Sequence, residues 1–202
     1  MRLLWGKMSP FARKVALAAH EVGLADAVEL VPTKVDMAQA NAEVQRSNPL
    51  SKVPTLILDD GSALYDSRTI CEYLDHLGAG TLFPAPPARW DALRKQSLAD
   101  GIMDALILWR QERLKEDRQT PAWMQTFADK VDASLQYLDG VAGQLGTETV
   151  DIGDISIGCA LTYLDARFED LAWRDRAPAL ARWHEGFEAR SSAIATHPFN
   201  PD

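Results

Sequence analysis

The chain has 202 residues, enough for one domain or two small ones, and 47% of them are hydrophobic, so a packed core needs no disulfide or metal staple. Its 29 acidic and 21 basic residues give a formal net charge of -8, which disfavours binding to the phosphate backbone of a nucleic acid. No stretch reaches the roughly 18 apolar residues of a membrane span, and polar residues interrupt every candidate signal core near the N-terminus. We therefore expect a cytoplasmic protein without a nucleic-acid or membrane partner.

The cysteines and histidines do not predict a metal site. Cys71 and Cys159 lie far apart in apparently helical segments, so they are interpreted as buried thiols in a reducing compartment. The histidines lack the spacing of metal ligands, and we expect all four to occupy surface or helix-end positions. They are His20, His76, His184 and His197.

Residues 1–80 predict a small α/β domain of the thioredoxin type, with helices packed on a four-stranded sheet. A helix that begins after Ser9 follows the first apolar strand, and Gly23 ends it. An Asp-Gly turn joins two later strands as a hairpin. The predicted strands and hairpin lie at 2–6, 27–31 and 53–67, and a second helix lies at 67–78.

Residues 88–202 predict an all-α domain. The segment 81–87 is the expected linker, because three prolines between 84 and 87 stop both helix and inner strand. Beyond it we expect a long helix from about 88 to 117 and another that begins at Thr120-Pro121 and runs to about 145. An amphipathic helix is expected at 178–187.

The segment 150–168 is the most specific local signal in the second half. Asp151 is placed to cap a helix, Asp154 stands three residues on to reach back, and Val150 and Ile155 fit a hydrophobic staple. The helix that follows is apolar on nearly every face, which predicts a place in the centre of the domain.

The segment "SNPLSKVPTLILDDGSALYDS" (47–67) carries the clearest chemistry. If the Val53–Pro54 bond is cis, the turn leaves the main-chain N–H and C=O of Val53 available to an extended peptide. Twelve residues later, Asp66-Ser67 begins a helix whose N–H groups suit a carboxylate, while the Asp66 carboxylate suits an ammonium. Together these features predict binding of a peptide with an α-amino-acid head group.

Three segments resemble the glutathione transferase family: "SPFARKV", "NPLSKVPTLILDDGSALYDS" and "DIGDISIGCALTYLD". The first two resemble its thioredoxin-like domain and the third its helical domain. The resemblance implies that Val53 pairs with the cysteine of glutathione beside cis-Pro54 and that Asp66 and Ser67 hold its γ-glutamyl end. It also implies that Lys52, with help from Lys34, approaches the glycine carboxylate.

Ser9 has two interpretations. Serine before proline is a preferred helix cap, and capping alone would explain the residue. The resemblance implies a second role, in which the Ser9 hydroxyl donates to the sulfur of glutathione and stabilises its thiolate. Ser9 would then be the catalytic residue, without acting as a nucleophile.

A weaker expectation concerns the second substrate. In the family, the long helix faces the cleft beside the thiol, so Trp109, Arg110 and Arg113 are candidates to bind the electrophile. A core tryptophan with two solvated arginines is an equally good interpretation. Lys52 and Asp66-Ser67 likewise have a structural alternative, as an exposed lysine and a helix cap.

The resemblance implies a homodimeric detoxification enzyme that adds reduced glutathione, as co-substrate, to a hydrophobic electrophile, without a metal or a tightly bound cofactor. Two alternatives stay open. The same site would suit a glutathione-dependent peroxidase or thiol reductase, and the same scaffold would suit a non-catalytic binding or regulatory protein.

Overall fold

The computed structural model describes residues 1–200, which form two compact units. Unit 1 comprises Met1–Pro86 together with the C-terminal segment from Ser191, and unit 2 comprises Pro87–Arg190. A small mixed sheet with helices in unit 1 and helices alone in unit 2 confirm the predicted fold class. The C-terminal segment groups with unit 1, whereas the sequence analysis assigns it to the helical domain.

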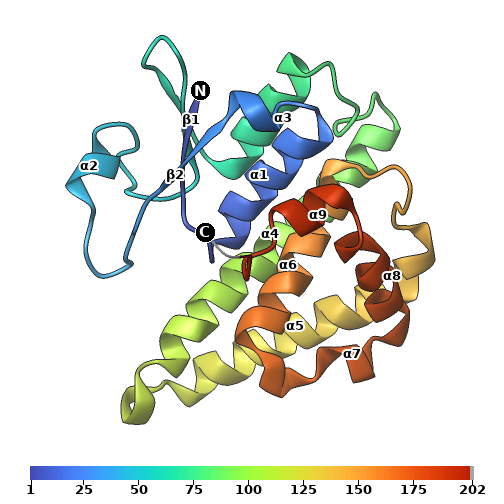
Figure 1. The fold of residues 1–202 in the computed structure, drawn as a ribbon. Coiled ribbons are helices and arrows are strands. Elements are labelled where there is room, and N and C mark those ends of the chain that lie inside the picture. Colours follow the sequence, from blue (N-terminus) through green and yellow to red (C-terminus); the bar gives the residue numbers. More distant parts are fainter. Residues whose placement is uncertain (201–202) are drawn as a thin grey trace. The chain divides into compact units, whose positions relative to one another are not determined.

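Unit 1 is built on a four-stranded sheet in the order β2-β1-β3-β4. β1 pairs in parallel with β2, and the other pairs are antiparallel. A parallel pair needs a long crossover, and the first helix supplies it. Figure 1 shows α1 and α3 beside each other on one side of the strands and the short α2 on the other. The strands are β1 (Arg2–Trp5), β2 (Glu29–Pro32), β3 (Thr55–Ile57) and β4 (Ala63–Leu64), and the helices are α1 (Pro10–Glu21), α2 (Ala42–Gln45) and α3 (Ser67–Leu77).

The core of unit 1 lies between the sheet and these helices. Leu3 and Leu56 are partners in the β1–β3 register, and both are fully buried. Val15 of α1 and Ile70 and Leu74 of α3 are also fully buried. Burying each such side chain contributes about 1.5–3 kcal/mol, so this layer fixes how α1 and α3 leave the sheet.

Arg13 holds the C-terminal segment against α1. Its side chain is 2% exposed, and it donates to the carbonyls of Ala193 and Thr196, each at 3.2 Å. Both carbonyls lie at the end of α9 (Ser191–Ala195), where a cation complements the helix dipole. The hydroxyl of Ser192 donates to the carboxylate of Glu21. These contacts explain why the segment belongs to unit 1.

Unit 2 is a helical bundle with α6 buried in it (Figure 1). Nearly every residue of α6 is buried, as its apolar sequence predicts. Gly158 allows α6 and α8 to approach each other closely, because a Cβ at this position would lie 2.1 Å from the ring of Phe187 in α8. The helices of unit 2 are α4 (Ala88–Arg113), α5 (Pro121–Val141), α6 (Ile152–Arg167), α7 (Trp173–Arg176) and α8 (Pro178–Glu188). Short 3₁₀ turns lie at Ala25–Ala27 in unit 1 and at Glu116–Arg118, Ala142–Gln144 and Glu169–Leu171 in unit 2.

The start of α6 is the predicted capping box. Asp151 accepts from the main-chain N–H of Asp154 at 3.0 Å, and the Asp154 side chain accepts from the N–H of Asp151 at 3.0 Å. The structure adds a cation that the sequence analysis missed. The ammonium of Lys95, in α4, lies 2.7 Å from Asp151 and 2.8 Å from Asp154. Burial lowers the pKa of Lys95, but its hydrogen bonds to both carboxylates outweigh that effect and leave the pKa above its ordinary value.

The expectation of a surface or helix-end position is wrong for His184. This side chain lies within α8 and is fully buried. Its Nδ1 is 2.8 Å from a guanidinium nitrogen of Arg174, and its Nε2 is 3.2 Å from the hydroxyl of Thr162. Because a guanidinium only donates, Nδ1 accepts here, which leaves Nε2 as the donor of the ring. The imidazole is therefore a satisfied core group.

Two further observations concern the sequence predictions. Cys71 and Cys159 are buried thiols, as expected. No helix within residues 1–200 is long and apolar enough to cross a membrane.

Replacing Lys95 by methionine should lower the free energy of unfolding by about 3–5 kcal/mol, because two carboxylates would be left close together without their cation. Arg94→Met is the matched control, since Arg94 is the preceding residue of α4 and its partners, Asp91 and the hydroxyl of Tyr137, lie at the surface. Its cost should stay below about 1 kcal/mol. Urea unfolding measures the free energy of unfolding of both variants, and equal losses would contradict a structural role for the buried contacts of Lys95 with Asp151 and Asp154.

The stabilising contribution of Lys95 should be fully present at pH values below its ordinary pKa and should disappear as the pH rises through its raised pKa.

Candidate functional site

The register of the sheet brings the predicted site residues of unit 1 to one end of it. Trp5 pairs with Pro32 in the parallel ladder, and Leu4 pairs with Thr55 in the antiparallel one. The carboxyl ends of β1 and β2 therefore meet the amino end of β3. β4 runs antiparallel to β3, so its carboxyl end lies there too. We call this the site end of the sheet. Because α1 follows β1 and α3 follows β4, both helices begin there with their partial positive charge.

Gly6 shows how closely the loops approach one another at the site end. A Cβ at this position would lie 3.6 Å from a methyl carbon of Val53, 3.7 Å from the carbonyl oxygen of Thr33 and 3.8 Å from the Cβ of Ser9. Ser9 and Val53, forty-four positions apart in the sequence, are thus both neighbours of a single point. The structure brings together the proposed catalytic residue and the proposed peptide-binding residue.

Ser9 is the N-cap of α1, and its cap leaves its proton unused. The Ser9 Oγ accepts from the N–H of Ala12 at 3.2 Å, and the N–H of Ser9 donates to the carbonyl of Gly6 at 2.8 Å. Within residues 1–200 no group accepts the hydroxyl proton of Ser9, and the side chain is half-buried. Capping uses a lone pair of the oxygen, whereas donation to a ligand uses the proton. The two interpretations of Ser9 are therefore compatible.

Val53 has two main-chain polar groups without partners. The Val53–Pro54 peptide bond is cis, and Pro54 is buried while Val53 is half-buried. In the described part of the chain, neither the N–H nor the C=O of Val53 has a hydrogen-bond partner. The preceding carbonyl, of Lys52, is held by the side chains of Asn48 and Thr55. Sequence reasoning missed both of these residues, although Asn48 stands in the Asn-Pro turn signal of the same motif.

Asp66 and Ser67 lie where β4 leads into α3. Asp66 caps the helix through Oδ1, which accepts from the N–H of Arg68 at 3.0 Å. The Asp66 side chain is exposed, and its other carboxylate oxygen has no partner among residues 1–200. Ser67 is 3% exposed. As at Ser9, capping uses one atom or lone pair of the side chain and leaves another polar group without a partner among the described residues.

Lys34 and Lys52 are both exposed, and one set of loop contacts links their segments. The side-chain amide of Asn41 donates to the carbonyl of Lys34 at 3.0 Å. The N–H of Asn41 donates to the hydroxyl of Ser51, next to Lys52, at 2.7 Å. Neither ammonium has an ion-pair partner in the described chain. Two unpaired cations therefore stand on loops that begin or end at the site end.

The three candidates in unit 2 have different surroundings. Trp109 is 4% exposed, with its ring 5.2 Å from that of Phe168, and the Arg113 guanidinium lies 4.7 Å from the Trp109 ring. Arg113 also forms an ion pair with Asp170 at 2.9 Å. These contacts favour the structural interpretation for Trp109 and Arg113. Arg110 is half-buried, near Tyr163, and has no ion pair among the described residues.

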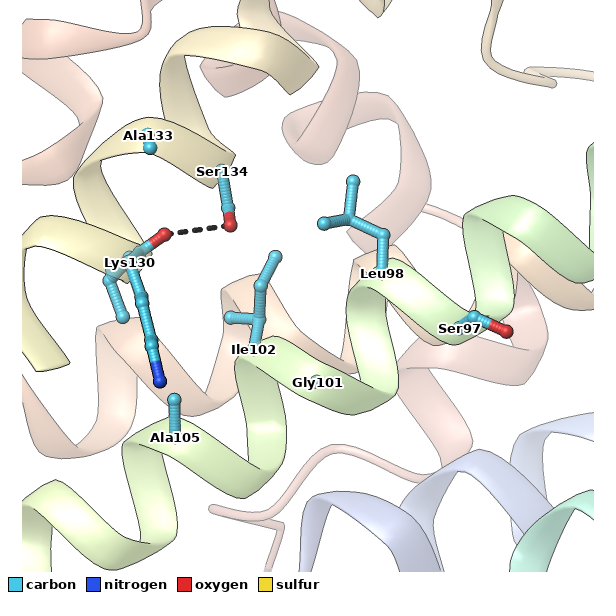
Figure 2. A pocket seen from close by; sticks show the side chains of 9 residues that line it. Ser97, Leu98, Gly101, Ile102, Ala105, Lys130, Ala133 and Ser134 are labelled. Atoms are coloured by element: carbon cyan, nitrogen blue, oxygen red, sulfur yellow. Dashed lines mark hydrogen bonds between the residues drawn. The ribbon is translucent and has the colours of Figure 1, made fainter.

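A second feature of unit 2 is a cavity of about 510 Å³ between α4 and α5. Figure 2 shows Leu98 and Ile102 of α4 and Ser134 of α5 around it, with the ammonium of Lys130 beside Ala105. Ser134 donates to the carbonyl of Lys130 at 2.7 Å, as is common for a serine within a helix. No group of acidic, histidine or cysteine side chains within residues 1–200 is arranged to hold a metal ion.

Comparison with known proteins identifies the family of the chain. Residues 8–77 match the family described as "Glutathione S-transferase, N-terminal domain", and residues 121–186 match "Glutathione S-transferase, C-terminal domain". The chain is 33% identical to the "Uncharacterized GST-like protein YibF" of Escherichia coli (strain K12), over 98% of both chains.

Solved structures extend the comparison. A glutathione transferase family member from Pseudomonas fluorescens Pf-5, with bound glutathione, is 39% identical, with a TM-score of 0.93 over 98% of both chains. A glutathione S-transferase from Methylobacillus flagellatus KT, also with glutathione bound, is 35% identical, with a TM-score of 0.88 over 98% of both chains. The fold, the two domain matches and these identities over nearly the whole length together establish that the chain belongs to the glutathione S-transferase family.

Proposed function

We propose that this protein binds reduced glutathione at the site end of the sheet, stabilises its thiolate and adds it to an electrophilic small molecule. One observation carries the proposal. The main-chain N–H and C=O of Val53 lack partners in the described chain, and so does the hydroxyl proton of Ser9. Side-chain carbons of Val53 and Ser9 both neighbour Gly6, and unsatisfied polar groups on residues gathered in this way favour a polar ligand near them.

The proposed ligand matches the groups around the site end. The cysteine of glutathione pairs with the N–H and C=O of Val53 as an added strand. Asp66 holds the α-ammonium of the γ-glutamyl end, and the start of α3 at Ser67 accepts its α-carboxylate. Lys52 and Lys34 approach the glycine carboxylate. The bound glutathione in the two solved relatives supports glutathione as the ligand.

Thiolate stabilisation at Ser9 is large enough to matter. A free thiol has a pKa near 8.5, and lowering it by two units takes about 2.7 kcal/mol of preferential stabilisation of the anion. The N-terminus of α1 contributes about 0.3–2 kcal/mol, and a hydroxyl that donates to an anion contributes about 1.5–3 kcal/mol. The two contributions together reach the required amount.

The proposed reaction needs no metal and no tightly bound cofactor. The thiol proton of glutathione passes to water, and the sulfur lone pair forms a C–S bond with the electrophilic carbon. In a substitution, the leaving group departs with its bonding pair; in an addition, the displaced pair takes a proton from water. The protein stabilises the thiolate of glutathione and holds it next to the electrophile.

The hydrophobic electrophile is the least specified part of the proposal. Trp109, Arg110 and Arg113 are retained as candidate contacts. Arg110 is the strongest of them, because its charge is not already paired within the described residues, whereas Arg113 is occupied by Asp170.

We also propose, from the family resemblance, that the enzyme is a cytoplasmic homodimer. Family members pair the first domain with the helices of the partner. A reducing compartment suits both reduced glutathione and two buried thiols.

A second candidate function is glutathione-dependent reduction of a peroxide or disulfide. Ser9 argues against its thiol-exchange form, because a cysteine at this position would favour a mixed disulfide with glutathione and the chain has serine there. A non-catalytic glutathione-binding role is the third possibility, since a fold does not determine an activity.

Calorimetry with reduced glutathione, followed by rate measurements with an aryl halide, a hydroperoxide and a disulfide, separates these functions. We expect binding and turnover of the aryl halide. Turnover of only the hydroperoxide or the disulfide would replace transfer by reduction. Binding without any turnover would favour the non-catalytic role, and a lack of binding would contradict the proposal.

Replacing Asp66 by asparagine should weaken glutathione binding about tenfold and leave stability within about 0.5 kcal/mol, because asparagine also caps helices but cannot pair with an ammonium. Asp36→Asn is the control, since Asp36 is an exposed carboxylate that likewise accepts from an N–H two residues on. It should change neither quantity. Equal dissociation constants for native protein and Asp66→Asn would remove Asp66 from the site.

A further inference from the structure

We propose that Asn48 and Thr55 are positioning residues that orient the Lys52–Val53 peptide so that its N–H faces the bound glutathione. This inference rests on the proposed function. Two buried polar side chains would then determine the direction of the main-chain N–H of Val53.

The carbonyl oxygen of Lys52 is held from the buried side by two donors. Asn48 is 1% exposed, and its amide nitrogen donates to Lys52 O at 3.2 Å and to the Oγ1 of Thr55 at 2.9 Å. Thr55 is fully buried, and its hydroxyl donates to the same carbonyl at 2.9 Å. Each polar atom in this triangle therefore has a partner, and the carbonyl has little freedom to rotate.

The orientation of the carbonyl determines that of the N–H. The Lys52–Val53 peptide bond is trans, and in a trans peptide the C=O and the N–H point in opposite directions across a rigid plane. Holding Lys52 O toward Asn48 and Thr55 therefore turns the N–H of Val53 away from them. That N–H is the one that lacks a partner in the described chain.

Asn48 is itself fixed on every side. Its Oδ1 accepts from the N–H of Leu50 at 3.0 Å, so the amide nitrogen must face the two oxygens. Its main-chain N–H donates to Val44 O at 2.8 Å, and its carbonyl accepts from the N–H of Ser51 at 2.9 Å. A site needs such a supporting layer, because small displacements of a positioned group reduce binding and catalysis.

Thr55→Val tests the inference, because it keeps the shape of the side chain and removes the hydroxyl. We expect the dissociation constant for reduced glutathione to rise about three- to tenfold, the loss expected for one imperfectly placed hydrogen bond. Thr55→Ser restores the hydroxyl and should bind within about twofold of the native protein. The pKa of the bound thiol should not change in either variant, because Ser9 is untouched.

The matched control is Thr196→Val. Thr196 is also buried in unit 1, and its hydroxyl also donates to a main-chain carbonyl, that of Ser192 at 2.8 Å. Its loss should leave glutathione affinity unchanged. An unchanged affinity in Thr55→Val, or an equal loss in Thr196→Val, would overturn the inference.

A measurement without ligand separates this inference from the proposed function. In the free protein, the nuclear magnetic resonance shifts of the Lys52 carbonyl carbon and the Val53 amide nitrogen should move in Thr55→Val and return in Thr55→Ser. Identical shifts in all three proteins would show that Thr55 does not orient the peptide. If the native protein does not bind glutathione, the assignment of the N–H to this ligand fails with the proposed function, whereas the shifts still report the orientation.

Discussion

The pairing of β1 with both of its neighbours is the constraint on which the site depends. A parallel ladder with β2 and an antiparallel ladder with β3 place the loops after Trp5 and Pro32 against the turn before Thr55. A slip of one residue between β1 and β3 would turn either Leu3 or Leu56, both buried, out of the core. The hydrophobic core of unit 1 therefore also fixes the distance between Ser9 and Val53. The groups proposed to bind glutathione therefore lie on loops whose positions are set by packing of the core. They are held in place before the ligand binds.

Each of the two helix-capping side chains at the site end has a polar group that capping does not use. Ser9 caps α1 with a lone pair and keeps its proton, and Asp66 caps α3 with one oxygen and keeps the other. Capping positions such groups accurately because a hydrogen bond to the main chain fixes the side chain. The capping box of α6 is the contrasting case. There, Asp151 and Asp154 are occupied by the main chain and by Lys95, so the same residue types serve stability alone.

Much of this arrangement could be predicted from the sequence, because its signals are local. The Val53-Pro54 and Asp66-Ser67 pairs, the Asp151 cap and the apolar α6 each lie within one short segment. Helices α2, α7 and α9, of four or five residues, are too short for periodicity to reveal them. The burial of His184 and the docking of the C-terminal segment by Arg13 depend on contacts with distant residues, up to 183 positions away for Arg13 and Thr196. Asn48 and Thr55 carried no signal of their role, since only the folded turn shows which carbonyl they hold.

The most direct test of the central claim is the ultraviolet titration of the thiol of bound glutathione, in the native protein and in Ser9→Ala. Unfolding curves for both proteins correct for the lost cap, which should cost about 0.5–2 kcal/mol. The account predicts a bound pKa well below that of free glutathione in the native protein and a higher one in Ser9→Ala. An equal bound pKa in the two proteins would contradict it and leave Ser9 as a helix cap alone.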